Sequence, residues 1–326
     1  MDSSVRPPVL SEFDLISRYF TRAPRHTTLA VGDDAALLSV SPGNELAASI
    51  DMLVEGVHFF VGVDPQALGH KALAVNLSDL AAMGAMPRWA MLSLALPDAD
   101  PQWLEGFSRG FFALADKHGV DLIGGDTTRG PRNICVQIMG EVRKGKALRR
   151  DGAKVGDDIW VSGELGDAAM AVAYRRDELV LDHAMLDRCI GKLDWPAPRV
   201  ALGLELGALA NSAIDISDGL LGDLAHICER SGVGARVEHS AVPCSADLRA
   251  LSDRGRVDRA IFSGGDDYEL CFTAASARAS EIEALSTTLE LRLTRIGRVV
   301  EGNAVVVADD SGRALAMKES GFDHFR

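Results

Sequence analysis

Residues 71–85 read K-A-L-A-V-N-L-S-D-L-A-A-M-G-A, an apolar helical pattern that contains one carboxylate, Asp79. In the order Ala72, Val75, Asp79 and Met83, each residue follows the one before it by three or four positions. A helix therefore places all four on one face. A carboxylate that enters a protein core without compensation is costly. The pattern therefore predicts that Asp79 meets either a basic side chain or a cation.

Both forms of compensation stay open at Asp79. Lys71, two helical turns earlier, is the nearest basic candidate. Hard cations such as Mg²⁺ take oxygen ligands, and they commonly join one or two carboxylates to the phosphates of a nucleotide. The five cysteines include no C-x-x-C pair and the sequence contains no H-E-x-x-H, so nothing indicates a zinc site. If a cation is bound, the residue types favour Mg²⁺.

Four further aspartate motifs lie beside glycine or at the end of an apolar stretch. They are V-G-D-D at 31–34, S-I-D at 49–51, I-G-G-D-T at 123–127 and A-I-D-I-S-D-G-L at 213–220. Asp-Gly by itself is ordinary turn chemistry. Together with the motif around Asp79, however, the set predicts an acidic site that holds cations.

Composition bounds the class of protein. At 326 residues, 47% hydrophobic and 25% charged, the chain is long enough for two domains. A net charge of -13 argues against non-specific nucleic-acid binding, which depends on Lys and Arg. The longest apolar stretch, 72–96, is interrupted by Asp79, Pro87 and Arg88, and residues 1–30 lack the pattern of a secretion signal. We therefore expect a cytoplasmic protein without a membrane span.

The first half alternates helical and strand patterns. Ser11, with Asp14 three residues later, predicts a capped opening helix. Strands are expected over 46–51, 88–96 and 133–142, and helices over 65–83 and 101–118. This alternation predicts an α/β or α+β architecture. The polar, glycine-punctuated stretch 144–157 indicates a domain boundary, so we expect domains at 1–148 and 149–326.

The second half begins a new set of strands and helices. The expected elements are a strand over 158–161, a helix from Ala168, a helix over 198–209, a strand-turn-helix over 213–230, and strands over 268–273, 291–296 and 304–307. The first strand is followed by S-G-E-L-G-D at 162–167. Its amides either receive a phosphate or form a plain strand-to-helix turn. The sequence leaves both interpretations open.

Other phosphate-binding motifs are absent from the sequence. There is no G-x-x-x-x-G-K-[ST], and no H-R-D-x-x-x-x-N followed by D-F-G. These absences argue against a P-loop enzyme and against a protein kinase.

Several long stretches resemble the thiamine-monophosphate kinases, a family of the aminoimidazole ribonucleotide synthetase superfamily. They are residues 71–85, L-I-G-G-D-T-T-R-G at 122–130, residues 213–220 and G-G-D-D-Y-E-L at 264–270. The likeness runs from the opening helix to G-F-D-H-F at 321–325. It implies a mixed-sheet α+β N-terminal domain that dimerises, followed by a C-terminal α/β domain that closes over the active site.

The resemblance also implies a reaction and its ligands. The reaction is direct in-line transfer of the γ-phosphoryl group of ATP to thiamine monophosphate, which gives thiamine diphosphate and ADP. The implied ligands of several Mg²⁺ ions are Asp34, Ser49, the main chain of Ile50, Asp51, Asp79, Asp126, Asp215 and Asp218. Those of ATP are Gly125, Asp126, Arg150 and Ser217, and those of thiamine monophosphate are His58, Asp266 and Phe322. Among these, Asp126 and Asp218 are the implied catalytic residues.

One position departs from the family pattern, and two other functions remain in competition. The family usually has G-G-E-D-Y-E-L, whereas this chain has Asp266 in place of the glutamate. A synthetase of the same superfamily is one alternative, although the reactive cysteine of selenophosphate synthetases precedes the first aspartate motif and the first cysteine here is Cys135. A nucleotide or Mg²⁺ sensor is the other. Release of ADP only in the presence of thiamine monophosphate would distinguish the kinase from both.

Overall fold

The structure is a computed structural model that describes residues 11–317 and residue 321. The chain divides into two compact units, and neither is a continuous stretch of sequence. The first is formed from Met1–Val40, Ile50–Leu73 and Pro87–Met139, and the second from Ser41–Ser49, Ala74–Met86 and Gly140–Arg326. The domain boundary expected between residues 148 and 149 stays a prediction.

The first described element is a short helix, capped as the sequence predicts. α1 (Glu12–Leu15) follows Ser11, whose hydroxyl accepts the N–H of Asp14, while the Asp14 carboxylate accepts the N–H of Ser11. This reciprocal pair satisfies N–H groups that the start of a helix leaves without partners. The chain continues as a π-helical turn, η1 (Ile16–Phe20), which buries Phe20.

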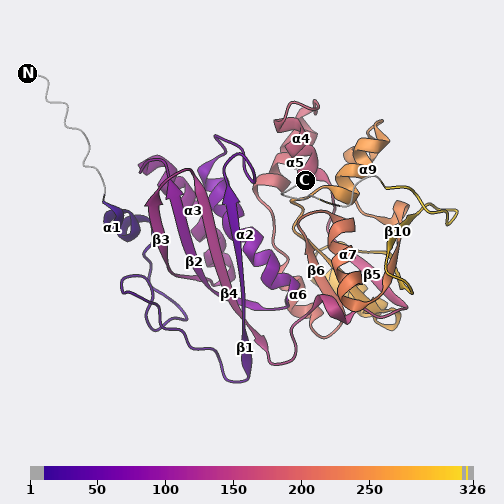
Figure 1. The fold of residues 1–326 in the computed structure, drawn as a ribbon, viewed down its shortest axis with the longest axis horizontal. Coiled ribbons are helices and arrows are strands. Elements are labelled where there is room, and N and C mark those ends of the chain that lie inside the picture. Colours follow the sequence, from indigo (N-terminus) through magenta and orange to yellow (C-terminus); the bar gives the residue numbers. More distant parts are fainter. Residues whose placement is uncertain (1–10, 318–320, 322–326) are drawn as a thin grey trace, which may run out of the picture. The chain divides into compact units, whose positions relative to one another are not determined.

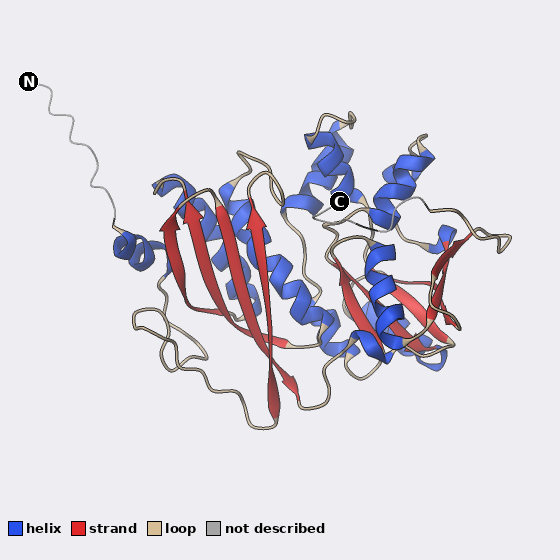
Figure 2. Ribbon diagram, viewed as in Figure 1, coloured by secondary structure: helices blue, strands red, loops and turns tan. Residues whose placement is uncertain are grey.

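A four-stranded sheet and two long helices follow (Figure 1). In chain order they are β1 (Asn44–Val54), α2 (Pro65–Ala82), β2 (Met86–Leu96), α3 (Pro101–His118), β3 (Asp121–Arg129) and β4 (Asn133–Arg143). The strand order is β1-β4-β2-β3, and β2 and β3 are parallel. Both helices lie on one face of the sheet (Figure 2). On part of the other face, Ala36 and Leu38 pack against a buried cluster that contains Trp89 and Ile123.

The long helix α3 has the end signals that its sequence predicts. The Asp100 side chain caps the start by accepting the N–H of Gln102, and Pro101 occupies the first turn, where its missing N–H costs nothing. Gly119 ends the helix with a left-handed φ of 66°, a conformation that glycine adopts without strain. These signals explain why the predicted and observed bounds of α3 coincide.

α2 and α3 approach each other closely at two glycines. A Cβ atom at Gly69 would lie 2.0 Å from the carbonyl oxygen of Phe107, and one at Gly110 would lie 1.8 Å from that of Gln66. Any side chain at either position would therefore overlap the main chain of the neighbouring helix. The two glycines set how closely the helices pack behind the sheet.

The second unit contains a six-stranded mixed sheet (Figures 1 and 2). Its elements are η2 (Arg150–Gly152), β5 (Asp157–Ser162), α4 (Asp167–Arg175), α5 (His183–Asp194), α6 (Val200–Leu206), β6 (Ser212–Ile216), α7 (Leu220–Ser231), β7 (Gly234–Glu238), η3 (His239–Ala241), α8 (Ala246–Ala250), α9 (Arg254–Ser263), β8 (Glu269–Ala275), η4 (Ser276–Arg278), α10 (Ala279–Thr288), β9 (Leu293–Val300) and β10 (Val305–Ala308). The strand order is β10-β7-β9-β5-β8-β6, and only the pair β10 and β7 is parallel.

The core of the second unit lies between this sheet and α7. The helix contacts β6, β7 and β10, and its apolar side chains Leu220, Leu224 and Ile227 are fully buried. These positions are spaced three or four residues apart, which is the period of one helix face. The sheet and α7 thus fix where β6 ends and the following loop begins.

Most of the expected elements are present, with shifts of a few residues at their ends. The expected helix over 65–83 is α2, which ends at Ala82. The expectation that Met83 shares a buried face with Asp79 is wrong, because Met83 lies beyond the helix and is 37% exposed. The sequence missed β3, whose two glycines disfavour a strand but which pairs with β2. No helix in the described ranges is long and apolar enough to cross a membrane.

Replacing Gly69 with alanine is expected to destabilise the protein, because the new Cβ would overlap the carbonyl group of Phe107. Overpacking of this kind typically costs about 1–3 kcal/mol. Gly191 in α5 is the control, since a Cβ there would meet no atom within 4 Å and alanine is favoured over glycine by about 0.5–1 kcal/mol in a helix. Urea unfolding measures both effects. A Gly69→Ala protein as stable as Gly191→Ala would contradict the close packing of α2 and α3.

Candidate active site

Asp79 lies in the second unit, next to a hydroxyl from β1. The Ser49 hydroxyl donates a hydrogen bond of 2.5 Å to the Asp79 carboxylate. Burial raises the pKa of Asp79, while the Ser49 hydrogen bond and the positive charge of Arg150 lower it in part. Burial disfavours the charged form of a carboxylate unless a positive charge compensates it. The site therefore holds a carboxylate and a hydroxyl where added positive charge would be favourable.

The residue before Asp79 connects α2 to the end of β6. The Ser78 hydroxyl, which is fully buried, donates a hydrogen bond of 2.8 Å to the carboxylate of Asp215. Asp215 is itself buried, so this bond offsets part of the cost of removing its carboxylate from water. Two consecutive residues of α2 thus contact two of the expected metal ligands.

The loop after β6 is held by a carboxylate that the sequence analysis missed. Asp223, in the first turn of α7, accepts the N–H groups of Ser217, Asp218 and Gly219 at 3.1, 3.1 and 3.2 Å. Its side chain is buried. Burial raises the pKa of Asp223 to about 7, with a further contribution from the negative charge of Asp218. This carboxylate fixes the main chain that carries two expected ligand residues.

A second loop, which contains Asp266, lies against the first. The N–H of Asp266 donates to the carbonyl of Ser217 at 2.9 Å, and the N–H of Tyr268 donates to that of Ile216 at 2.8 Å. The φ angles of Asp266 and Tyr268 are 67° and 50°, a left-handed conformation that residues other than glycine rarely adopt. The Tyr268 hydroxyl also donates to the Asp266 carboxylate at 3.2 Å.

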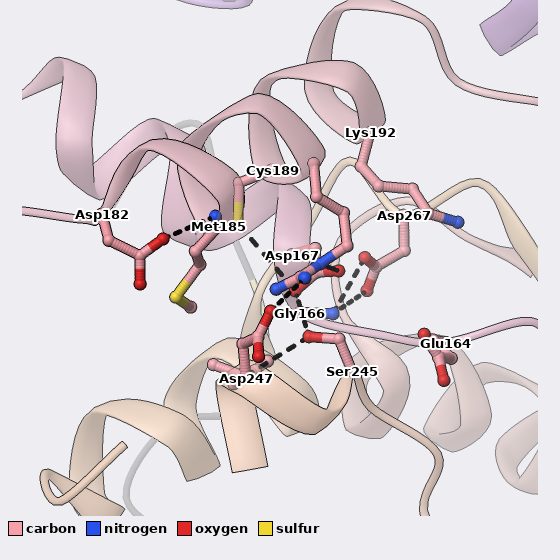
Figure 3. Close-up of polar contacts among 12 residues, drawn as sticks. Glu164, Gly166, Asp167, Asp182, Met185, Cys189, Lys192, Ser245, Asp247 and Asp267 are labelled. Atoms are coloured by element: carbon pink, nitrogen blue, oxygen red, sulfur yellow. Dashed lines mark hydrogen bonds and ion pairs between the residues drawn. The ribbon is translucent and has the colours of Figure 1, made fainter. Parts of the chain in front are cut away.

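The segment S-G-E-L-G-D at 162–167 forms a plain turn and not a phosphate loop. The amides of Gly163 and Leu165 donate to main-chain carbonyls, and that of Gly166 donates to the Asp267 carboxylate at 3.0 and 3.2 Å. Figure 3 shows this carboxylate directed at the amide. Burial raises the pKa of Asp267 well above its usual value. These amides already have partners, so the structure favours the second of the two interpretations.

In the first unit, Asp34, Gly125 and Asp126 line one cavity of about 710 Å³. The cavity is also lined by apolar side chains, among them Phe13 and Leu92. Gly125 lies directly against β2, because a Cβ at this position would be 1.7 Å from the carbonyl oxygen of Leu92. Asp33 also lines the cavity. The cavity therefore combines three carboxylates with apolar walls, a combination that suits a ligand with both charged and flat apolar parts.

His58 lies in the turn after β1. The N–H of Val54 donates to its Nδ1 atom at 3.0 Å, so in the neutral ring the proton is on Nε2. Within the strand, Ile50 is 61% exposed while Ser49 and Asp51 are less exposed, as the alternation of a strand requires.

The expected ligand residues are distributed over both units. The first unit contains Asp34, Ile50, Asp51, His58, Gly125 and Asp126, and the second contains Ser49, Asp79, Arg150, Asp215, Ser217, Asp218 and Asp266. Among the residues that the structure describes, no three His, Cys, Asp or Glu side chains form a group that could hold a metal ion. Phe322 lies outside the described residues. The full ligand set therefore stays a prediction.

Three residues near the expected ligands were not identified from the sequence: Ser78, Asp223 and Tyr268. Ser78 has a recognisable signal, because it is a polar residue in an apolar helix directly before Asp79. Asp223 lies five residues after Asp218, at a helix start where acidic residues are common. Only the tertiary structure shows that its carboxylate folds back onto the loop.

Known proteins match both parts of the chain. The family described as "AIR synthase related protein, N-terminal domain" matches residues 32–142, and "AIR synthase related protein, C-terminal domain" matches residues 154–310. Thiamine-monophosphate kinase of Escherichia coli (strain K12) is 43% identical over 318 residues, which cover 96% of this chain and 98% of the relative. The chain belongs to the thiamine-monophosphate kinase family.

Solved structures of thiamine-monophosphate kinases have the same fold. The enzyme from Stenotrophomonas maltophilia K279a is 49% identical with a TM-score of 0.83, and covers 89% of this chain and 92% of its own. The structure "AaThiL complexed with AMPPCP and TMP" is 32% identical with a TM-score of 0.77, and covers 91% of this chain and 92% of its own. The family resemblance and the predicted two-part α+β and α/β fold are confirmed.

Within this kinase fold, Gly125→Ala is expected to disturb the strand that carries Asp126. Its Cβ would overlap the carbonyl of Leu92, so we expect a loss of about 1–3 kcal/mol in the free energy of unfolding together with a lower turnover rate. The adjacent Gly124→Ala is the control, because its nearest neighbour, the end of the Met91 side chain, would be 3.6 Å away. Thermal melting and steady-state rates measure both variants. Equal effects at the two glycines would contradict the close approach of β3 to β2.

Proposed function

We propose that this chain transfers the γ-phosphoryl group of ATP to thiamine monophosphate, giving thiamine diphosphate and ADP. The observation that carries the proposal is the near full-length identity to thiamine-monophosphate kinases, among which a 32% identical structure binds AMPPCP and TMP. AMPPCP is a non-hydrolysable analogue of ATP. The structure adds that the loops bearing Ser217 and Asp266 are in direct main-chain contact.

The acceptor requires no general base from the protein. The second pKa of a phosphate monoester is near 6, so thiamine monophosphate is already an anionic nucleophile at neutral pH. The difficulty is electrostatic, because two phosphate-bearing anions must approach in line. We therefore assign the protein residues to binding, orientation and charge compensation, with direct transfer and no phosphoenzyme.

Arg150 is the basic residue best placed to compensate charge in the second unit. Its positive charge lowers the pKa of Asp79 in part, which supports a place for the guanidinium near the acidic residues. We propose that Arg150 contacts the phosphates of ATP.

Ser217 is proposed to contact ATP through its hydroxyl. Its N–H donates to Asp223, and its carbonyl accepts the N–H of Asp266. Because both main-chain groups already have partners, the side-chain hydroxyl is the group that remains for the nucleotide. Gly125 and Asp126 are proposed to contact ATP from the cavity of the first unit, and Asp126 and Asp218 to act as catalytic residues.

The oxygen donors fit Mg²⁺. Ser49 and Asp79 bring a hydroxyl and a carboxylate within 2.5 Å of each other, and hard cations bind such oxygens together with substrate phosphates. We propose that these residues and Asp34, Ile50, Asp51, Asp126, Asp215 and Asp218 hold several Mg²⁺ ions. When bound, Mg²⁺ would neutralise charge on the phosphates. The ligand residues of this chain would determine where the Mg²⁺ ions lie.

His58 and Asp266 are proposed to bind thiamine monophosphate. The Nδ1 of His58 accepts the N–H of Val54, which fixes the orientation of the ring. Asp266 is one methylene shorter than the usual glutamate of the family, and the hydroxyl of Tyr268 holds its carboxylate. A carboxylate suits the amino group and the cationic ring of thiamine. Phe322 is proposed as a further contact from the family resemblance.

A homodimer is also proposed. On one side of β1 the apolar residues Leu46, Ala48, Ile50 and Met52 are exposed. An exposed apolar stripe of this kind is typical of a surface that a partner covers. Sedimentation velocity on the purified chain would check the assembly. The cytoplasmic location stays a prediction of the sequence.

One assay tests the proposed reaction. ADP release should depend on thiamine monophosphate and should not occur with thiamine or thiamine diphosphate as the acceptor. Incubation with labelled ATP alone should leave no acid-stable label on the protein, because transfer is direct. ADP formation without an acceptor would support a different enzyme of the fold, and absence of ADP under all conditions would support a sensor.

Asp79→Asn and Asp126→Asn should each lower the rate by orders of magnitude while the chain stays folded. Each change keeps the size of the side chain but removes the charge proposed to hold Mg²⁺, and electrostatic stabilisation commonly contributes more to catalysis than any other single effect. Steady-state rates at saturating Mg²⁺ measure the loss, with circular dichroism as the check on folding. Turnover like that of the wild type in either variant would refute that residue's metal assignment.

A further inference from the structure

Three consecutive peptide groups after β6 direct their N–H bonds to one oxygen atom. The N–H groups of Ser217, Asp218 and Gly219 all donate to Oδ2 of Asp223, at 3.1, 3.1 and 3.2 Å. Successive N–H groups that point into one concavity form a site for an anion. In this protein the buried carboxylate of Asp223 fills that concavity from within the chain.

The carbonyl groups of the same three peptides face other segments. Those of Ile216 and Ser217 accept the N–H groups of Tyr268 and Asp266 at 2.8 and 2.9 Å. The carbonyl oxygen of Asp218 would be 3.1 Å from a Cβ built at Gly321, so this glycine lies against it. Because N–H and C=O point in opposite directions in a trans peptide, the three peptides separate Asp223 from both segments.

The contact between the two loops is close and conformationally demanding. A Cβ at Gly265 would lie 2.5 Å from the carbonyl oxygen of Ser217, so a side chain at 265 would prevent the approach. The neighbouring residues Asp266 and Tyr268 have left-handed φ angles of 67° and 50°. Such angles persist in residues other than glycine only where the surroundings impose them. The carbonyls of residues 216 and 217 supply that constraint through two hydrogen bonds.

We propose that Asp223 is a positioning residue that couples the nucleotide loop at 217–219 to the acceptor loop at 264–268. It acts by setting the tilt of the peptides between them, and it contacts neither substrate itself. The inference rests on the proposed function, because it assigns ATP to Ser217 and thiamine monophosphate to Asp266. A change at Asp223 should therefore affect the use of both substrates.

Substitutions at Asp223 separate the position of its oxygen from its charge. Asp223→Leu removes the acceptor, and kcat/KM for each substrate is expected to fall about 100-fold, as for a misplaced catalytic group. Asp223→Asn keeps an oxygen in place and should remain within about tenfold of the wild type. Asp223→Glu keeps the charge but moves the oxygen by one methylene, so it should behave like the leucine variant. If the Asp223→Leu protein does not fold, the Asp223→Glu protein tests the positioning role in its place.

A matched control separates positioning from a general loss of stability. Asp157, at the start of β5, is another buried carboxylate. It accepts the N–H of Lys154 and the side-chain amide of Asn211. Asp157→Leu should lower the melting temperature but leave kcat and both KM values of the folded enzyme unchanged. If it lowers kcat/KM as much as Asp223→Leu does, the positioning role is wrong.

Amide hydrogen exchange tests the coupling without turnover. In Asp223→Leu and Asp223→Glu, peptides covering 264–268 should exchange faster than in the wild type, although this loop does not contain the mutation. Asp223→Asn should keep their protection. Unchanged exchange at 264–268 in the leucine and glutamate variants would overturn the proposal even if the enzyme is a thiamine-monophosphate kinase. If the kinase reaction itself is not observed, this measurement still decides whether the loops are coupled.

Discussion

The hydrogen bond from Ser78 to Asp215 is the contact on which the arrangement of the second unit's acidic residues depends. It joins α2 to the end of β6 in fully buried surroundings, where a hydrogen bond is strong and an unpaired carboxylate is costly. The next residue, Asp79, points to a different partner, the hydroxyl of Ser49 on β1. Because successive residues of a helix differ in direction by about 100°, one turn of α2 connects to both strands.

The buried carboxylates of the second unit are stabilised in two different ways. Glu269 is paired with the guanidinium of Arg199 and also accepts the Ser162 hydroxyl, so its charge is compensated within the protein. Asp223 and Asp267 instead accept main-chain N–H groups, and burial raises the pKa of both. Hydrogen bonds from neutral donors satisfy a carboxylate without cancelling its charge. Both lie at proposed ligand loops: Asp223 accepts N–H groups of the loop at 217–219, and Asp267 belongs to the loop at 264–268 and accepts the N–H of Gly166.

Asp266, the acidic residue that departs from the family pattern, lies in a constrained loop. Asp266 has a left-handed main chain, and its N–H is held by the carbonyl of Ser217. The Tyr268 hydroxyl, two residues further along, donates to its carboxylate. The position of this carboxylate is thus set by contacts within the second unit. We interpret Tyr268 as the residue that keeps Asp266 oriented.

The sequence by itself determined the element types, the family and the identity of the acidic motifs. Helical periodicity predicted α3 to the residue, and Asp79 stood out because a carboxylate in an apolar helix needs a partner. It could not predict β3, whose glycines disfavour a strand until β2 pairs with it, nor the end of α2 before Met83. The role of Asp223 was decided only by the tertiary structure. Three N–H groups converge on one oxygen because α7 packs against the sheet, and that convergence depends on contacts between segments whose positions no local pattern records.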